Sequence, residues 1–305
     1  MSRLFGIAGV QMAPIAWNAD ATVTKMADLV KQIGLNFPWV QLVLFHELVV
    51  PGLVHFVSAQ PDQWRRNAQA IPGPLTDRLC EMARQAHKWV VPGSMYELEN
   101  GAIYNTAIVI SPHGEIVAKY RKMFPWLPYE AGTTPGRDFC VFDIEGVGRF
   151  GLCICYDIWF PEVVRSLTWL GAEVILQPTM TPTSDRALEV VLSQANAITN
   201  QAYFIGLNGI GPYGGGKSLI VDPDGRVLQQ AGDHETILTE IIDLDHVTRT
   251  REYGTLGLAQ TLKQLRDGDH RFPIYEQGIA IGEGFKALGS LVFQRQLSLE
   301  TLDPR

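Results

Sequence analysis

Short apolar runs rich in β-branched residues alternate along this chain with stretches whose apolar residues recur at helical spacing. In the first third, the apolar runs are Leu4–Val10, Leu42–Phe45 and Trp89–Pro92, and the helical stretches lie near Ala21–Ile33 and Thr76–His87. Runs of the first kind predict buried strands, and stretches of the second kind predict amphipathic helices. Their alternation predicts an α/β layered fold.

The same alternation continues in the second half of the chain. Pro161 followed by Glu162 predicts a helix start, because proline suits the first helical position and an acid is favourable in the first turn. That helix should end before Gly171. The other predicted elements are strands at Arg149–Ile154, Glu173–Gln177, Tyr203–Asn208 and Thr236–Ile241, and a helix near Asp185–Thr199.

Two strand pairs are joined by residues that favour tight turns. Asn105–Ile110 and Glu115–Tyr120 flank a Ser-Pro-His-Gly turn, and Lys217–Val221 and Val227–Gln229 flank an Asp-Pro-Asp-Gly turn. Such turns predict antiparallel hairpins within the layered fold. The glycine-rich run Gly206–Gly216 lacks the spacing of a phosphate-binding loop, so we interpret it as a flexible loop.

The regular pattern weakens after Asp243, where polar turns become frequent. We therefore predict one domain over residues 1–245. Residues 246–305 should form a C-terminal extension that packs on the same domain or across a subunit interface.

Composition narrows the class of partner. With 305 residues, 46% of them hydrophobic, the chain can bury a large core. The formal net charge of −7, with no block of Lys or Arg, argues against nucleic acid as a partner. The N-terminal apolar run is too short to span a membrane and lacks a convincing cleavage site, so we expect a cytoplasmic protein with a small-molecule substrate and no membrane partner.

The cysteines indicate reduced thiols. Four cysteines in a chain of this length are too few and too irregularly spaced for a disulfide framework: Cys80, Cys140, Cys153 and Cys155. The seven histidines are scattered, so no second ligand cluster accompanies the Cys-x-Cys pair, and we expect neither a metal nor a cofactor. Cys153 fits inert packing within a strand, whereas Cys155 lies just past the strand end.

Polar residues follow three predicted strands. Glu47 ends the first, Lys122 ends the second ahead of a Pro- and aromatic-rich loop that carries Glu130, and Cys155 ends the third. Ligands in open α/β folds bind at the carboxyl ends of strands, so these positions are candidates for chemistry. Taken singly, each residue also has an ordinary structural explanation. Glu47 could cap a neighbouring amide, Lys122 could be a solvated charge, and a cysteine could be core packing.

Taken together, the three segments are more specific. A glutamate after an early strand, a lysine in Tyr-Arg-Lys, and a cysteine before Tyr-Asp-x-x-x-Pro-Glu resemble the nitrilase superfamily of carbon–nitrogen hydrolases. The resemblance spans roughly Phe5 to Ile242, and the loop from Lys122 to Glu130 looks most like aliphatic amidases and formamidases. One departure is His46, where the family usually has proline before its glutamate.

The resemblance implies a fold and a set of roles. The fold would be a single-domain, four-layer αββα sandwich, paired at least as a homodimer. Glu47 would be the general base, Lys122 a cationic stabiliser, Cys155 the nucleophile and Glu130 an additional active-site glutamate.

Elementary chemistry agrees with those roles. A thiol with a pKa near 8.5 needs a base before it attacks an amide, and Glu47 can take its proton. The Lys122 ammonium and the backbone N–H of Tyr156 would stabilise the oxyanion. Glu47 would then protonate the leaving amine and activate water against the thioester, while Glu130 orients the amide or that water.

The aromatic residues near these segments indicate the substrate. Trp126, Tyr129, Tyr156, Trp159 and Phe160 would form a compact pocket for a short uncharged acyl group. The segment after Cys155 contains no arginine to bind a carboxylate. We expect hydrolysis of a small aliphatic amide, with N-carbamoyl compounds or nitriles as alternatives and a catalytically silent binding protein as a remote one.

Overall fold

Two β-sheets form the centre of the computed structural model, which describes residues 2–52, 63–278 and 282–288. The first sheet has the strand order β13-β1-β2-β3-β5-β4, with β6 also paired to β5. Its strands are β1 (Leu4–Gln11), β2 (Leu42–Phe45), β3 (Trp89–Val91), β4 (Ser94–Glu99), β5 (Ala102–Ile110), β6 (Ile116–Arg121) and β13 (Thr236–Asp243).

The second sheet has the strand order β12-β11-β10-β9-β8-β7. Strands β8, β9 and β10 run parallel to one another. On either side of them, β7 pairs with β8 and β11 pairs with β10 in antiparallel orientation. The strands are β7 (Cys140–Ile144), β8 (Gly148–Leu152), β9 (Val174–Pro178), β10 (Tyr203–Leu207), β11 (Leu219–Val221) and β12 (Val227–Gln230).

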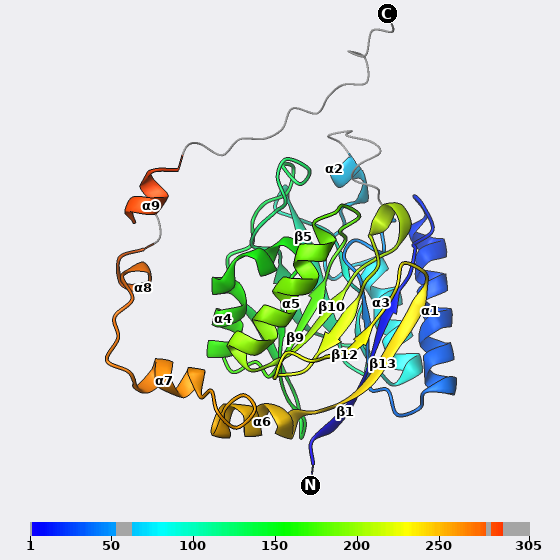
Figure 1. Cartoon of the computed structure of the whole chain (residues 1–305). Coiled ribbons are helices and arrows are strands. Elements are labelled where there is room, and N and C mark those ends of the chain that lie inside the picture. The colour runs from blue at the N-terminus through cyan, green and yellow to red at the C-terminus, as the bar shows by residue number, and fades with distance from the viewer. Residues whose placement is uncertain (1, 53–62, 279–281, 289–305) are drawn as a thin grey trace, which may run out of the picture.

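Helices cover the outer face of each sheet (Figure 1). On the first sheet lie α1 (Ala19–Asn36) and α3 (Pro74–Ala86), and on the second lie α4 (Pro161–Trp169) and α5 (Arg186–Asn200). Asn18 caps α1 by accepting a hydrogen bond from the backbone N–H of Ala21. Shorter elements are α2 (Gln63–Asn67), η1 (Cys155–Trp159) and η2 (Gly211–Tyr213).

Three layers of apolar packing account for this arrangement. One core lies between the sheets, where side chains such as Leu44 and Leu152 are fully buried. A second joins the first sheet to α1 and α3, and a third joins the second sheet to α4 and α5. Central strands such as β2 and β10 are buried on both faces and therefore read as continuous apolar runs. The predicted αββα sandwich is confirmed.

Two strands were missing from the sequence-based prediction. In β4, Glu97 is buried as an ionic partner of Lys119 and Arg121, so a charge interrupts the apolar pattern that would mark a strand. The short strand β7 buries Cys140, Phe142 and Ile144 in alternation, as an edge strand does. The predicted hairpins, β5 with β6 and β11 with β12, both form.

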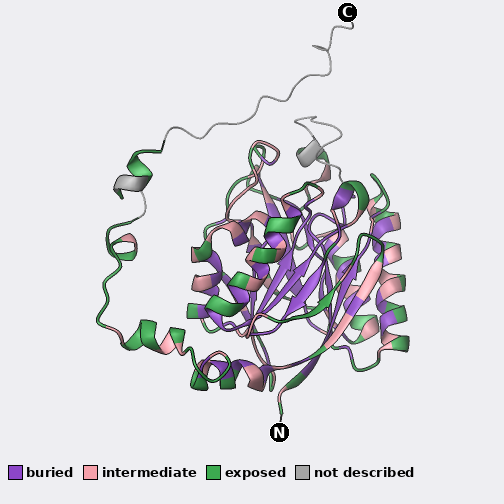
Figure 2. Ribbon diagram, viewed as in Figure 1, coloured by how far each residue is buried: buried purple, intermediate pink, exposed green. Residues whose placement is uncertain are grey.

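The C-terminal segment begins on the sandwich and then leaves it. Helix α6 (Leu244–Tyr253) buries Leu244, Val247 and Thr250. Neither α7 (Thr261–Asp267) nor α8 (Pro273–Gln277) has a buried residue, and with α9 (Glu283–Lys286) they lead away from the sheets (Figures 1 and 2). Among the described helices, none combines the length and the apolar character needed to cross a membrane.

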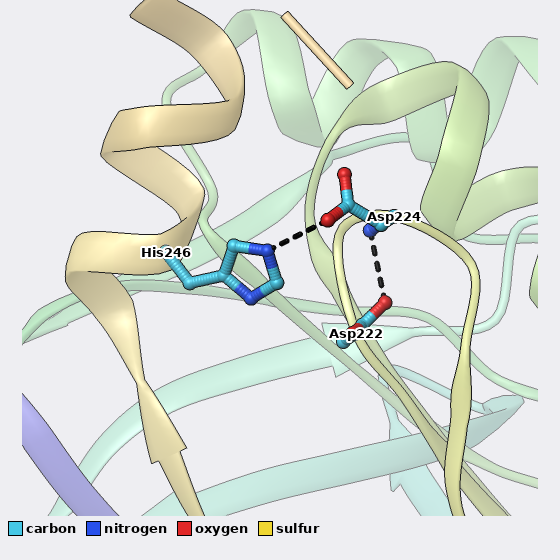
Figure 3. Close-up of side chains that lie close together, drawn as sticks. All are labelled: Asp222, Asp224 and His246. Atoms are coloured by element: carbon cyan, nitrogen blue, oxygen red, sulfur yellow. Dashed lines mark hydrogen bonds and ion pairs between the residues drawn. The ribbon is translucent and has the colours of Figure 1, made fainter. Parts of the chain in front are cut away.

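A cluster of Asp222, Asp224 and His246 attaches α6 to the β11–β12 turn (Figure 3). Oδ1 of Asp222 accepts hydrogen bonds from the backbone N–H groups of Asp224 and Arg226, both at 2.9 Å. Nε2 of His246 lies 2.9 Å from Oδ2 of Asp224. Although these side chains could ligate a metal ion, their hydrogen bonds already give them a structural role in the turn.

Candidate active site

The ends of β2 and β9 bring the two sheets together at one place. Glu47 follows β2 after a single residue, and its backbone N–H donates to the carbonyl of Thr179, which follows β9, at 3.3 Å. Lys122 immediately follows β6 and donates its backbone N–H to the carbonyl of Asn105 in β5 at 2.8 Å. Strand ends from both sheets therefore supply the polar residues of the site.

Lys122 connects the two predicted carboxylates. Its Nζ lies 2.9 Å from Oε1 of Glu47 and 2.5 Å from Oε2 of Glu130. Asn105 Nδ2 donates to both carboxylates at 2.8 Å. All three charged side chains are at most 3% exposed. Such a buried cluster is costly to desolvate, which points to a functional rather than a stabilising role.

The charges within this cluster shift each other's protonation. Burial and the nearby Glu130 raise the pKa of Glu47, Lys122 opposes them, and the balance places it at about 7. Burial alone would lower the pKa of Lys122, but the fields of Glu130 and Glu47 outweigh burial and hold it well above its usual range. Lys122 is therefore a permanent cation, and Glu47 is poised to exchange a proton near neutral pH.

Cys155 begins the tight turn η1, and two residues separate it from the end of β8. Its φ of +48° lies in the left-handed region, which is uncommon for a residue with a side chain. The buried Asp157 holds this turn by accepting hydrogen bonds from Ile154 N at 2.9 Å and from the Tyr120 hydroxyl at 2.7 Å. Its other oxygen accepts from Phe124 N at 2.9 Å, so one carboxylate fixes both the cysteine turn and the loop after Lys122.

The Cys155 thiol is protonated in the resting site. Burial, together with the charge of Glu47, raises its pKa well above the usual value, and Lys122 only partly opposes this. The same thiol lowers the pKa of Glu47 through a side-chain hydrogen bond. Attack by sulfur therefore requires proton transfer to Glu47 as the new bond forms, rather than a preformed thiolate.

The predicted aromatic residues divide into two groups. Trp126 and Tyr156 line a cavity of about 10 Å³ beside Cys155, together with Met180, Thr181, Asp185 and Glu189. Tyr129 and Trp159 are not among the residues that line it. Tyr129 stacks on Trp126 with ring centroids 4.6 Å apart, and Trp159 lies 6.1 Å from Tyr156, so each contacts a lining residue.

Several polar residues of the site had no clear mark in the sequence. Asn105 bridges the two glutamates, yet it sits inside an apolar strand. Thr181 lies in a Thr/Pro-rich loop, with its Oγ1 3.8 Å from Cys155 Sγ. Glu189 lies in α5, a helix that the sequence predicts without indicating any site residue in it. The buried face of α5 is mostly polar, with Arg186, Ser193, Asn196 and Asn200 at helical spacing around Glu189, and this polar stripe is the signal by which Glu189 could have been found.

Curated proteins with similar sequences include formamidases. Those of Bacillus thuringiensis strain Al Hakam and Bacillus cereus strain AH820 are each 29% identical over 219 residues, covering 69% of this chain. The matched region spans about 64% of the length of these relatives.

Solved structures share the fold over most of the chain. Nit3 of Saccharomyces cerevisiae, a member of branch 10 of the nitrilase superfamily, has a TM-score of 0.75 at 25% identity and covers 83% of this chain and 94% of its own. The carbon-nitrogen hydrolase of Helicobacter pylori G27 has a TM-score of 0.77 at 24% identity, covering 90% and 98%. An amidase from Nesterenkonia sp. has a TM-score of 0.68 at 25% identity, covering 82% and 94%.

The sequence profile of the carbon-nitrogen hydrolases matches residues 6–252, which include the described site. Both the residue pattern and the fold are thus those of one family. The chain therefore belongs to the carbon-nitrogen hydrolase family, within the nitrilase superfamily.

Proposed function

We propose that the protein hydrolyses short aliphatic amides to the carboxylic acid and ammonia through a thioester on Cys155. The observation that carries this proposal is the buried cluster of Glu47, Lys122 and Glu130 next to that thiol. It combines a base with a pKa of about 7, a permanent cation and a second carboxylate, which are the groups that acyl transfer from an amide requires.

In the first half of the reaction, Cys155 Sγ attacks the amide carbon while its proton passes to Glu47. The Lys122 ammonium and the backbone N–H of Tyr156 stabilise the oxyanion, and one such donor is typically worth about 3 kcal/mol. Glu47 then protonates the amide nitrogen, the carbon–nitrogen bond breaks, and ammonia leaves. The acyl group remains on sulfur as a thioester.

In the second half, water replaces ammonia. Glu47 takes a proton from the water as its oxygen attacks the thioester carbon, and the carbon–sulfur bond breaks as the carboxylic acid forms. The proton returns from Glu47 to Cys155 sulfur. Glu130 stays fixed by Lys122, by Asn105 and by the backbone N–H of Trp126, which suits a group that orients the amide or the water.

The size of the cavity supports a small acyl group. At about 10 Å³ it has room for roughly one water molecule, so any acyl group requires the lining residues to move, and the movement needed is smallest for the shortest acyl groups. The similar proteins are named formamidases, and formamide is the smallest amide. A mutant of the amidase from Nesterenkonia sp. AN1 was solved with butyramide, and another carries the acetamide moiety of fluoroacetamide on its active-site cysteine.

Nitriles and N-carbamoyl compounds are the alternatives. A nitrile would undergo the same thiol attack but give a thioimidate, and a carbamoyl amino acid would need a cation to bind its carboxylate. No lysine or arginine is among the residues lining the cavity beside Cys155, which favours a neutral amide over a carbamoyl amino acid.

The test is ammonia release from formamide, propionamide, benzamide, a short nitrile, N-carbamoyl-β-alanine and an N-carbamoyl-D-amino acid. We expect turnover of formamide and propionamide, little from benzamide, and loss of all release in Cys155→Ala. Cys80→Ala, which changes a cysteine on α3 away from the site, is the matched control and should keep full activity. Turnover confined to nitriles or carbamoyl compounds would refute the amide assignment while retaining the nucleophile.

A further inference from the structure

The cavity beside Cys155 has a wall of carboxylates. Asp185 and Glu189 both line it, and no lysine or arginine is among its lining residues. Asp185 directly precedes α5 and Glu189 lies four positions later, so one turn of the helix carries both side chains on the same face. An acyl group attached to Cys155 would therefore meet two negative charges.

Glu189 is held rigidly in this wall. Its Oε1 accepts a hydrogen bond from Thr181 Oγ1 at 3.0 Å, and that same Oγ1 lies 3.8 Å from Cys155 Sγ. Its Oε2 accepts from Arg186 Nη1 at 3.0 Å. Glu189 is only 2% exposed, and one hydroxyl thus separates its carboxylate from the nucleophile.

The cation that balances Glu189 does not face the cavity. Arg186 donates through Nε to the carbonyl of Gly216 at 3.1 Å and through Nη2 to that of Lys217 at 2.8 Å. These bonds fix the guanidinium behind the carboxylate, on the side of the β10–β11 loop. A substrate in the cavity therefore approaches the negative end of this ion pair first.

We propose that Glu189, assisted by Asp185, determines the charge selectivity of the acyl pocket, which accepts uncharged and cationic short amides and rejects those that carry a carboxylate. This inference rests on the proposed function and makes it more specific. The physical basis is Coulombic, because a substrate carboxylate next to two fixed carboxylates in a poorly hydrated cavity is repelled, whereas an ammonium is attracted. Glu189 is a specificity-determining residue in this account and takes no part in bond making.

The first test compares two alkylating reagents of nearly equal size, iodoacetamide and iodoacetate, which differ in charge. The rate of Cys155 labelling by each is measured by peptide mass spectrometry, and the ratio of the two rates is divided by that for glutathione. Labelling does not require turnover, so the result is independent of which substrate the enzyme hydrolyses.

We expect the wild-type protein to disfavour iodoacetate at Cys155 more than glutathione does, by at least about tenfold. Glu189→Gln should remove most of this discrimination, because it also leaves the Arg186 cation without its partner. Asp185→Asn, at a partly exposed position that tolerates change more easily, should reduce it by a smaller factor. Glu252→Gln, an exposed glutamate on α6, is the matched control and should leave the ratio unchanged.

The second test uses turnover of propionamide, glycinamide and malonamate at pH 7, which are neutral, cationic and anionic amides of similar size. In wild type, kcat/KM should be lowest for malonamate, and Glu189→Gln should raise the malonamate-to-propionamide ratio while lowering the glycinamide-to-propionamide ratio. Unchanged labelling and turnover ratios in folded Asp185→Asn and Glu189→Gln would overturn the inference. Absence of amide turnover with an altered labelling ratio would instead refute the proposed function and leave the charge selectivity standing.

Discussion

Lys122 Nζ donates a hydrogen bond to Glu47 Oε1 across 2.9 Å, although the two residues are 75 positions apart and follow different strands of the same sheet. Both side chains are almost completely buried. The contact joins two separate strand ends, and the Lys122 cation holds the Glu47 carboxylate in place and lowers its pKa against the effect of burial.

Removing the Lys122 cation should lower both the stability and the activity of the protein. Lys122→Met leaves Glu47 and Glu130 buried without their shared partner, and we expect a loss of about 3–5 kcal/mol in the free energy of unfolding together with loss of amide hydrolysis. Urea unfolding at pH 8, where protonation relieves the carboxylates least, measures the stability. Lys31→Met, at an exposed position on α1, is the control. Equal stability of the two variants would show that Lys122 does not neutralise the glutamates.

The pH dependence of kcat/KM should report the pKa of Glu47. Glu47 must be ionised to accept the thiol proton, and its pKa is raised to about 7, so kcat/KM should fall as pH drops through about 7. Glu130 raises that pKa by its charge, so Glu130→Gln should move the acid limb of the residual activity to lower pH. Initial rates of ammonia release between pH 5 and 9 measure both. A limb that stays in place in Glu130→Gln would mean that another group titrates.

Asp157 should act as a positioning residue. Its carboxylate accepts hydrogen bonds from Ile154 N, Phe124 N and the Tyr120 hydroxyl. Asp157→Asn turns one acceptor into a donor that faces these donors, and we expect a loss of about 1–3 kcal/mol in stability. Activity should fall mainly in kcat, since the Cys155 turn loses its support. Thermal unfolding and steady-state kinetics separate the two effects, and an unchanged kcat in a destabilised variant would limit Asp157 to a structural role.

Besides the residue roles and the substrate, three expectations from the sequence stay predictions. These are a homodimer or larger assembly, a cytoplasmic location, and the division at residue 245 into a domain and an extension. The exposed apolar side chains of Phe272, Tyr275 and Leu288 in the extension would suit burial at a subunit interface. Light scattering after size-exclusion chromatography should give at least twice the chain mass of 33.8 kDa, and truncation after Gly268 should lower it if the extension joins the subunits.

The fold was predictable because the central strands of both sheets are buried on both faces. Runs such as Leu42–Phe45 are uniformly apolar, and the helices between them show a clear apolar stripe. Strand β4 escaped prediction because Glu97 is buried there through ion pairs with distant residues, which no local pattern reveals.

The candidate site was predictable only in part, for a related reason. Glu47 follows the apolar strand β2, Lys122 follows the basic end of β6, and Cys155 follows the apolar segment that begins with β8, so each position is conspicuous in the sequence. The structure adds that strands of both sheets end at this one site. Asn105 and Glu189 lie within elements instead. Asn105 acts through a contact with Glu47 across 58 positions, and Glu189 through its hydrogen bond from Thr181 in the loop after β9. Such contacts exist only in the folded chain.

We expect Cys155 to carry the acyl group during turnover. The most direct measurement is mass spectrometry of the Cys155 peptide after rapid acid quench of the wild-type enzyme during turnover of propionamide. We predict a propionyl thioester on Cys155 and on none of the other three cysteines. Continued turnover with an unmodified Cys155 peptide at every quench time, together with undiminished ammonia release by Cys155→Ala, would contradict the account.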